Sequence, residues 1–235
     1  MTTTQVNQIT NRLLDALPFK DREQLLANCE AIELIFGEVL YRANEPVLHV
    51  YFPTGGFISL VTSVDSSANL EVGLVGNEGI LGVSLMLGVN VAPFYSLVQG
   101  AGSALRMTAS SFLYELERSP ALQLELKHYL YITMRQLAQT AICTRYHLVE
   151  ARLARWLLMT QDRAHSDRFH VTHVFLAYIL GVRRVGITKA ANSLLKKKLI
   201  SYKRGDITIL DRAGLEAASC ECYRVDKEIY ERILA

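Results

Sequence analysis

The sequence predicts an α+β fold: an N-terminal antiparallel β-roll of the double-stranded jelly-roll type, then a long helix, then a C-terminal winged helix-turn-helix. Three observations predict it. Short extended segments separated by turn residues dominate the first half of the chain, one unbroken helical run follows Pro120, and two helical runs with a basic hairpin lie near the C-terminus. Many short strands at regular intervals are typical of a sandwich or a roll.

Length and composition bound the class of protein. The chain has 235 residues, of which 50% are hydrophobic, so it can bury the core of one large domain or of two modest ones. No run approaches the roughly 20 apolar residues that span a bilayer, and the N-terminus lacks a basic and then apolar leader pattern. We therefore expect a cytoplasmic protein without a membrane partner.

The first half of the chain is predicted to hold two short helices and then a series of strands. Apolar residues recur at helical spacing from Gln5 to Ala27, and Leu17-Pro18 separates the two runs because proline cannot continue a helix. From Cys29 the pattern becomes extended, with Gly, Pro and Asn marking the turns. The expected strands are residues 31–36, 39–41, 49–52, 57–62, 70–75, 95–99 and 104–107.

Ser119-Pro120 begins the long helical run. Within it, apolar and threonine side chains recur at spacings of 4, 3, 4, 3 and 4, which is a seam of the coiled-coil kind. We expect this seam to be a dimer interface. Its residues are Leu126, Leu130, Thr133, Leu137, Thr140 and Thr144. The alternative is a helix that packs only on its own roll, since three threonines make a weak seam.

A helix-turn-helix is predicted from Thr172 onward. Thr172 can cap a first helix with its hydroxyl, and the apolar pattern of that helix stops at Gly181. In the second helix we expect four apolar residues to face inward and five polar ones to face outward. The inward set is Val185, Ala190, Leu194 and Leu195, and the outward set is Arg183, Arg184, Thr188, Lys189 and Asn192.

The outward set points to DNA binding. A helix fits the major groove, where Arg and Lys donate to guanine and Thr reaches a base edge or a phosphate. A strand, a basic turn at Lys203-Arg204 and a second strand follow, as in a wing. The alternative is a helical hairpin with a solvated basic face. The candidate DNA-binding residues are Thr172, His173, Arg183, Arg184, Val185, Thr188, Lys189, Lys203 and Arg204.

Charge is distributed unevenly along the chain. Residues 1–147 carry 9 basic and 13 acidic side chains, residues 148–210 carry 12 and 4, and residues 211–235 carry 4 and 6. The net charges are therefore −4, +8 and −2, although the whole chain has only +2. A localised positive segment between acidic ones is typical of a polyanion-binding surface.

These motifs resemble a known family. Residues from about His147 to Leu210 are similar to the DNA-binding domain of the Crp/Fnr bacterial transcription regulators, without gaps over Val171 to Ile200. Gly37-Glu38-Val39-Leu40-Tyr41, Val50-Tyr51-Phe52 and Gly56-Phe57-Ile58, with Gly76 and Gly82, resemble the family's β-roll sensor domain, which is shared with cyclic-nucleotide-binding proteins.

The resemblance implies a homodimer on near-palindromic double-stranded DNA, with RNA polymerase as a further partner. It also implies that Arg184, Val185 and Lys189 touch base edges. Val185 replaces a common acidic residue of the family, and valine cannot accept a hydrogen bond from a cytosine amine. The sequence that this protein reads should therefore differ from that of relatives with the acidic residue.

The sensor domain departs from the cyclic-nucleotide pattern. Where such members have Gly-Glu, this chain has Gly82-Val83, and Pro93 or Phe94 stands where their phosphate-binding arginine is expected. A buried phosphate without a cation is costly, so control by cyclic AMP in the usual pose is not expected. The apolar stretch could instead line an effector pocket, or it could simply close the roll. The pocket residues are Gly82, Val83, Ser84, Phe94 and Tyr95.

No cofactor is expected. Only Cys29 precedes Cys143, so the N-terminal cysteine cluster that holds iron and sulfur in the oxygen-sensing branch is missing. His49 or His128 could serve as an axial ligand of a haem, but a lone histidine more often has a structural role.

No metal site is expected either. Cys220-x-Cys222 could bind a metal or respond to oxidation, but we find no partner pair with ligand spacing in the sequence. Three histidines near the first helix cannot share one helical face, so we expect surface positions or phosphate contacts for them. They are His165, His170 and His173.

The predicted organisation has four parts. They are a β-roll sensor domain with N-terminal helices (1–118), a dimerisation helix (119–146), a winged helix-turn-helix (147–210) and a helical tail (211–235). The predicted function is sequence-specific transcription regulation. The alternative is a nucleotide- or small-ligand-binding module whose β-roll is the main site. An enzyme is not expected, because no nucleophile elbow, phosphate loop or paired-histidine motif occurs.

Overall fold

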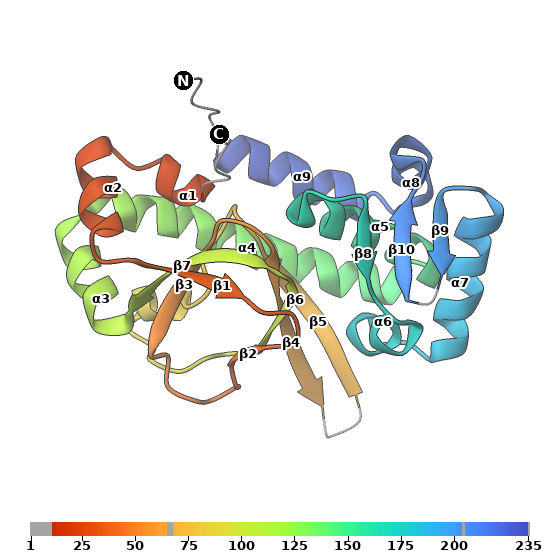
Figure 1. Ribbon diagram of the computed structural model, residues 1–235, viewed down its shortest axis with the longest axis horizontal. Coiled ribbons are helices and arrows are strands. Elements are labelled where there is room, and N and C mark those ends of the chain that lie inside the picture. The colour runs from red at the N-terminus through yellow and green to blue at the C-terminus, as the bar shows by residue number, and fades with distance from the viewer. Residues whose placement is uncertain (1–10, 65–67, 204, 235) are drawn as a thin grey trace, which may run out of the picture.

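The long helix α4 (Pro120–Tyr146) runs along most of the molecule and joins its two halves (Figure 1). The computed structural model describes residues 11–64, 68–203 and 205–234. A β-roll with short helices packs along the N-terminal part of α4, and a helical domain with a small sheet lies at its C-terminal end. This arrangement confirms the predicted α+β fold.

Two short helices precede the roll. The first is α1 (Arg12–Asp15), capped by Asn11, whose buried amide donates to two backbone carbonyls of the roll at 3.0 and 2.8 Å. Pro18 precedes the second, α2 (Phe19–Leu26). The two predicted helices are therefore present. The part of that prediction before Asn11 lies outside the described residues.

The strands of the roll form two sheets. Their orders are β1-β7-β3 and β2-β6-β4-β5, and every pairing is antiparallel. The expected strands are all present, with ends that differ by at most two residues. They are β1 (Glu30–Leu34), β2 (Val39–Tyr41), β3 (His49–Pro53), β4 (Phe57–Val64), β5 (Ala68–Val75), β6 (Tyr95–Gly100) and β7 (Gly102–Thr108).

Helices close the open side of the roll. A 3-10 helix, η1 (Val83–Leu87), lies between β5 and β6, and α3 (Ala109–Arg118) follows β7. Ser119 caps α4 with its hydroxyl, and Pro120 occupies the first turn, where its missing N–H costs nothing. One side of α4 then packs into the core of the roll, together with Phe52 and Phe112.

The C-terminal domain has the helix-turn-helix and wing that were predicted. Its elements are α5 (Val149–Ala164), β8 (Arg168–His170), α6 (His173–Leu180), α7 (Arg184–Lys196), β9 (Ile200–Lys203) and β10 (Asp206–Ile209). Strand β8 was not predicted. It pairs with β10, which converts the expected two-stranded wing into a sheet of order β8-β10-β9. Trp156 is buried in this core.

The segment predicted as a helical tail contains two helices. The helices are α8 (Arg212–Ala218) and α9 (Cys222–Ile233), and the extended backbone of Ser219 ends the first. Helix α9 runs back along α4 toward the roll (Figure 1). Among the described residues, no helix combines the length and the apolarity that a membrane crossing requires.

Candidate nucleic-acid interface

The turn between α6 and α7 sets the position of the second helix. The Thr172 hydroxyl accepts a hydrogen bond of 3.1 Å from the N–H of Phe175, so it caps α6 as predicted. Gly181 ends α6 with a φ of 61°, a left-handed conformation that glycine adopts without a Cβ penalty. Helix α7 therefore begins at a defined angle to α6, with Arg183 as its N-cap.

Helix α7 has one buried and one exposed face. The outward face carries Arg184, Val185 and Lys189, and Val185 is 59% exposed. Val185 and Leu195 were expected to face inward, and that prediction was wrong. At about 100° per residue, Val185 lies on the opposite side of α7 from Ala190 and Leu194, which face the core as predicted. The buried residues are Ile187, Ala190, Ala191 and Leu194.

Three cations at this end of α7 are free. Arg183, Arg184 and Lys189 are exposed, and no carboxylate of residues 11–64, 68–203 or 205–234 forms an ion pair with them. Lys197, at the other end, pairs with Glu150 at 2.6 Å. The uncompensated donors therefore lie at the N-terminal end of α7, where a helix that enters the major groove meets base edges.

Thr188 and His173 are bonded within the protein. The Thr188 hydroxyl donates to the Arg184 carbonyl at 3.1 Å and lies 3.2 Å from Nδ1 of His173. The His173 ring stacks on Tyr202 of β9, with centroids 4.5 Å apart. Burial, and secondly the charge of Arg184, lowers the pKa of His173, so this imidazole is neutral near pH 7. His173 thus connects α6, α7 and the wing.

The wing presents one described cation. Lys203 is exposed at the end of β9, whereas Arg204 lies outside the described residues. Across the hairpin, Asp206 pairs with Arg168 at 2.7 Å and with His170 at 3.0 Å. The hydrogen bonds from His170 and then Arg168 lower the pKa of Asp206. This carboxylate holds β8 against β10 and leaves Lys203 unpaired among the described residues.

The expected effector pocket is only partly assembled. A cavity of about 60 Å³ is lined by four of the predicted residues, Gly82, Val83, Ser84 and Phe94, but not by Tyr95. Its other walls come from β2, β4, β5, β6 and α4, and none of the described side chains that line it is charged. The cavity is therefore small and lacks a partner for a phosphate.

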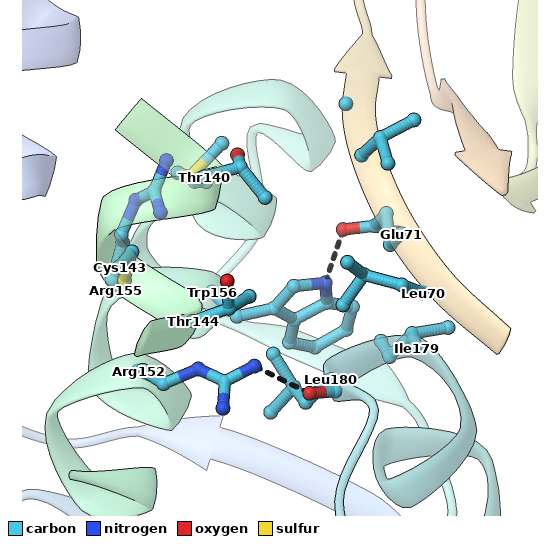
Figure 2. A pocket seen from close by; sticks show the side chains of 13 residues that line it. Leu70, Glu71, Thr140, Cys143, Thr144, Arg152, Arg155, Trp156, Ile179 and Leu180 are labelled. Atoms are coloured by element: carbon cyan, nitrogen blue, oxygen red, sulfur yellow. Dashed lines mark hydrogen bonds between the residues drawn. The ribbon is translucent and has the colours of Figure 1, made fainter. Parts of the chain in front are cut away.

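A second cavity lies where the two halves of the molecule meet. It is about 50 Å³ and lies between β5, α4, α5 and α6 (Figure 2). In it, the indole of Trp156 donates to Glu71 at 2.8 Å, and Arg152 donates to the Leu180 carbonyl. Nearby, buried Arg163 of α5 pairs with buried Glu78 of the roll at 2.7 Å. Sequence patterns had not predicted the two bonds that cross between the halves, Trp156 to Glu71 and Arg163 to Glu78.

The residues predicted to form the dimer seam do not lie on the exposed side of α4. Leu126 is 0% exposed and belongs to the core of the roll, so its assignment to a dimer interface was wrong. The other seam residues, from Leu130 to Thr144, lie at the edge of the buried face. The exposed side of α4 instead carries an apolar set: Leu124, Tyr131, Met134, Ile142 and Tyr146.

The expectation that no metal-binding set exists also needs correction. Cys143 at the end of α4, His147 at its C-cap and the pair Cys220 and Cys222 converge, with all ligand atoms within 4.8 Å of one another. These residues could hold a metal ion. Cys143 and His147 are four residues apart at the end of α4, a spacing that is visible in the sequence, but only the fold brings them to the second pair. Of the described cysteines, Cys29 lies outside the cluster.

Comparisons with known proteins agree with this geometry. Residues 151–218 match the family of Crp-like helix-turn-helix domains. No curated protein matches the chain.

Three solved structures illustrate how far the fold likeness extends. FixK2 from Bradyrhizobium japonicum is 13% identical, with a TM-score of 0.69 over 82% of this chain and 98% of its own. The c-di-GMP-responsive regulator CLP from Xanthomonas campestris is 14% identical, with a TM-score of 0.67 over 82% and 99%. A CRP-family regulator from Thermus thermophilus is 17% identical, with a TM-score of 0.66 over 80% and 96%. Residues 151–218 therefore belong to the Crp-like helix-turn-helix domains, and the chain as a whole has the fold of the Crp/Fnr regulators.

Proposed function

We propose that the protein is a cytoplasmic homodimer that reads a near-palindromic operator by inserting α7 of each protomer into the major groove. One observation carries this proposal: Arg184, Val185 and Lys189 form an outward face of α7 without an acidic partner among the described residues. Arg184 and Lys189 can donate to guanine, and Val185 can contact a thymine methyl. Arg183, Thr172 and Lys203 would contact phosphates.

The dimer is inferred from the free side of α4. Met134 is 68% exposed and Tyr131 is 47% exposed, although both lie in the middle of a long helix. Apolar side chains gathered on one side of a helix usually mark an interface. If two α4 helices pack along this side, two α7 helices can face the same side of one duplex, about one DNA turn apart. RNA polymerase is the further partner we expect.

Regulation by a cyclic nucleotide in the usual pose is not part of this proposal. The cavity beside Gly82 and Phe94 has about 60 Å³, far less than the roughly 300 Å³ of a small-ligand site, and it has no described cation. The same facts weigh against the alternative of a module whose roll is mainly a nucleotide receptor. Any effector of this cavity would have to be very small and uncharged, or would have to open it.

Selection of bound sequences from random DNA tests the proposal. We expect the purified full-length chain to enrich an inverted repeat whose half-sites are about one helical turn apart. Enrichment of no sequence, or of a single unpaired half-site, would contradict it. Calorimetry with cyclic nucleotides on the same preparation tests the alternative, which requires saturable binding.

A further inference from the structure

Four side chains that the DNA-binding role does not use meet where α4 ends and the tail returns. Cys143 lies in the last turn of α4, and His147 is the C-cap of that helix. Cys220 and Cys222 lie on either side of the point where α9 begins. The three cysteines are buried. They come from segments 77 residues apart, yet the Sγ atoms of Cys143 and Cys220 are 3.6 Å from each other.

We propose that Cys143, His147, Cys220 and Cys222 form a structural zinc site of the Cys3His type. Tetrahedral Zn²⁺ with bonds of about 2.3 Å to sulfur and about 2.0 Å to nitrogen places two sulfurs about 3.8 Å apart and a sulfur and a nitrogen about 3.5 Å apart. The observed distances are 3.6 Å between the Cys143 and Cys220 sulfurs and 3.3 Å from the Cys222 sulfur to Nδ1 of His147. The ligand cage therefore has nearly the size that one zinc ion requires.

The donor set selects the metal. Thiolates and an imidazole suit zinc, whereas calcium and magnesium take oxygen ligands. All ligand atoms lie within 4.8 Å of one another, which fits one central ion. The body of an iron-sulfur cluster would separate its thiolates further. Four protein ligands also leave no open position for substrate, so the site is structural and not catalytic.

The surroundings compensate the charge of such a centre. Zinc with three thiolates and a neutral imidazole carries one negative charge. The Arg155 guanidinium lies beside the Cys143 sulfur, and Arg152 is close enough to interact with the charge of that sulfur. Arg155 also pairs with buried Asp226 at 2.6 Å. Two guanidinium groups thus balance Asp226 and the metal centre. Figure 2 shows Arg155 beside Cys143.

The site would join three segments of the chain. It ties the α8–α9 junction to the end of α4, and α5 of the DNA-binding domain begins at Val149, two residues after His147. Bound zinc would therefore hold the tail against the junction between the sensor half and the DNA-binding half. This gives the tail a structural role that does not depend on the DNA-binding proposal.

Zinc titration of the reduced, full-length protein tests the site. We expect one tightly bound Zn²⁺ per chain, and X-ray absorption showing three sulfur neighbours at about 2.3 Å and one nitrogen at about 2.0 Å. Cys220→Ser, Cys222→Ser and His147→Ala should each weaken zinc binding by at least about 100-fold, the upper range known for changes around metal ligands. Cys29→Ser is the matched control and should bind zinc like the wild type.

A rescue variant separates ligation from folding. His147→Cys should keep the zinc, because four thiolates also form a closed zinc site, whereas a general packing role for the imidazole would not be restored by cysteine. Zinc should also slow proteolysis of the tail in the wild type but not in Cys220→Ser. A reduced wild-type protein that binds no more zinc than the Cys220→Ser/Cys222→Ser double variant would overturn the proposal, as would iron as the bound metal.

Discussion

The indole nitrogen of Trp156 donates a hydrogen bond of 2.8 Å to Glu71, and this bond joins α5 of the DNA-binding domain to β5 of the roll. Ser59 donates to the other oxygen of the same carboxyl group at 2.5 Å. Trp156 is the single tryptophan of the chain. Its fluorescence therefore reports specifically on the contact between the two halves.

The Glu71 carboxyl group in this contact should ionise near neutral pH. Burial raises the pKa of Glu71 to about 7, against the hydrogen bonds from Ser59 and Trp156 and the charges of Arg163 and Arg155. A raised carboxyl pKa means that folding favours the protonated form. The contribution of Glu71 to the free energy of unfolding is therefore fully present below the unfolded pKa of about 4.5. Up to about 3 kcal/mol of that stability is lost as the pH rises through the folded pKa of about 7. Trp156 fluorescence should change with a midpoint near pH 7.

Glu71→Gln is the control for that titration. The amide keeps an acceptor for the indole but does not ionise, so the fluorescence step near pH 7 should disappear. If the same step persists in this variant, another group causes it and the assignment to Glu71 is wrong.

The ion pair between Glu78 and Arg163 should be important for stability. Both side chains are buried, and Glu78→Ala would leave the guanidinium without its carboxylate. We expect a loss of about 3–5 kcal/mol in the free energy of unfolding, measured by urea denaturation. Glu228→Ala removes an exposed partner of Arg224 and should cost less than about 1 kcal/mol. Equal losses in the free energy of unfolding for the two variants would show that burial does not determine how much an ion pair contributes to stability.

Alanine substitutions at Arg184 and at Lys203 should weaken DNA binding in different ways. Arg184→Ala should cost about 1–3 kcal/mol on the selected operator and relax the preference at one base pair of each half-site. Lys203→Ala should weaken all sequences alike and reduce the salt dependence of binding. Binding to operator and random DNA over a salt series measures both. Equal losses on both DNAs from Arg184→Ala would refute base contact.

Val185 should limit which bases are read. It is exposed between Arg184 and Lys189, where an apolar side chain can touch a thymine methyl but cannot accept from cytosine. Val185→Glu introduces that acceptor, so selection from random DNA should then favour cytosine at one position of each half-site. An unchanged selected sequence would show that this side chain does not reach the bases.

Met134 should lie in the dimer interface. Met134→Glu places a charge on the apolar side of α4 in both protomers, because a twofold interface repeats every substitution. We expect a cost of several kcal/mol, which raises the dimer dissociation constant on the order of 100-fold or more. Sedimentation measures it. Leu113→Glu, at an exposed position of α3, is the control and should leave the dimer intact. A stable Met134→Glu dimer would place the interface elsewhere.

Some sites were predictable because their signals are local. Thr172 caps α6, Gly181 ends it and Ser119-Pro120 starts α4, and each depends on residues within one turn of the chain. The side of α7 that packs on the core was not fixed by such local signals. Val185 was assigned inward from apolarity alone, because a short helix allows two phases of the apolar pattern, and only packing against α5 and α6 selects one.

The sequence by itself determined the order of helices and strands, the position of the basic α7 and the absence of an arginine near Phe94, since these depend on residue type and short-range spacing. Only the tertiary structure decided which side chains meet: Glu71 with Trp156 across 85 residues, and Cys143 with Cys220 across 77. It also decided that Leu126 is buried while Met134 is free. The physical reason is that such contacts depend on how distant elements pack, and periodicity along one helix carries no information about the surface that covers it.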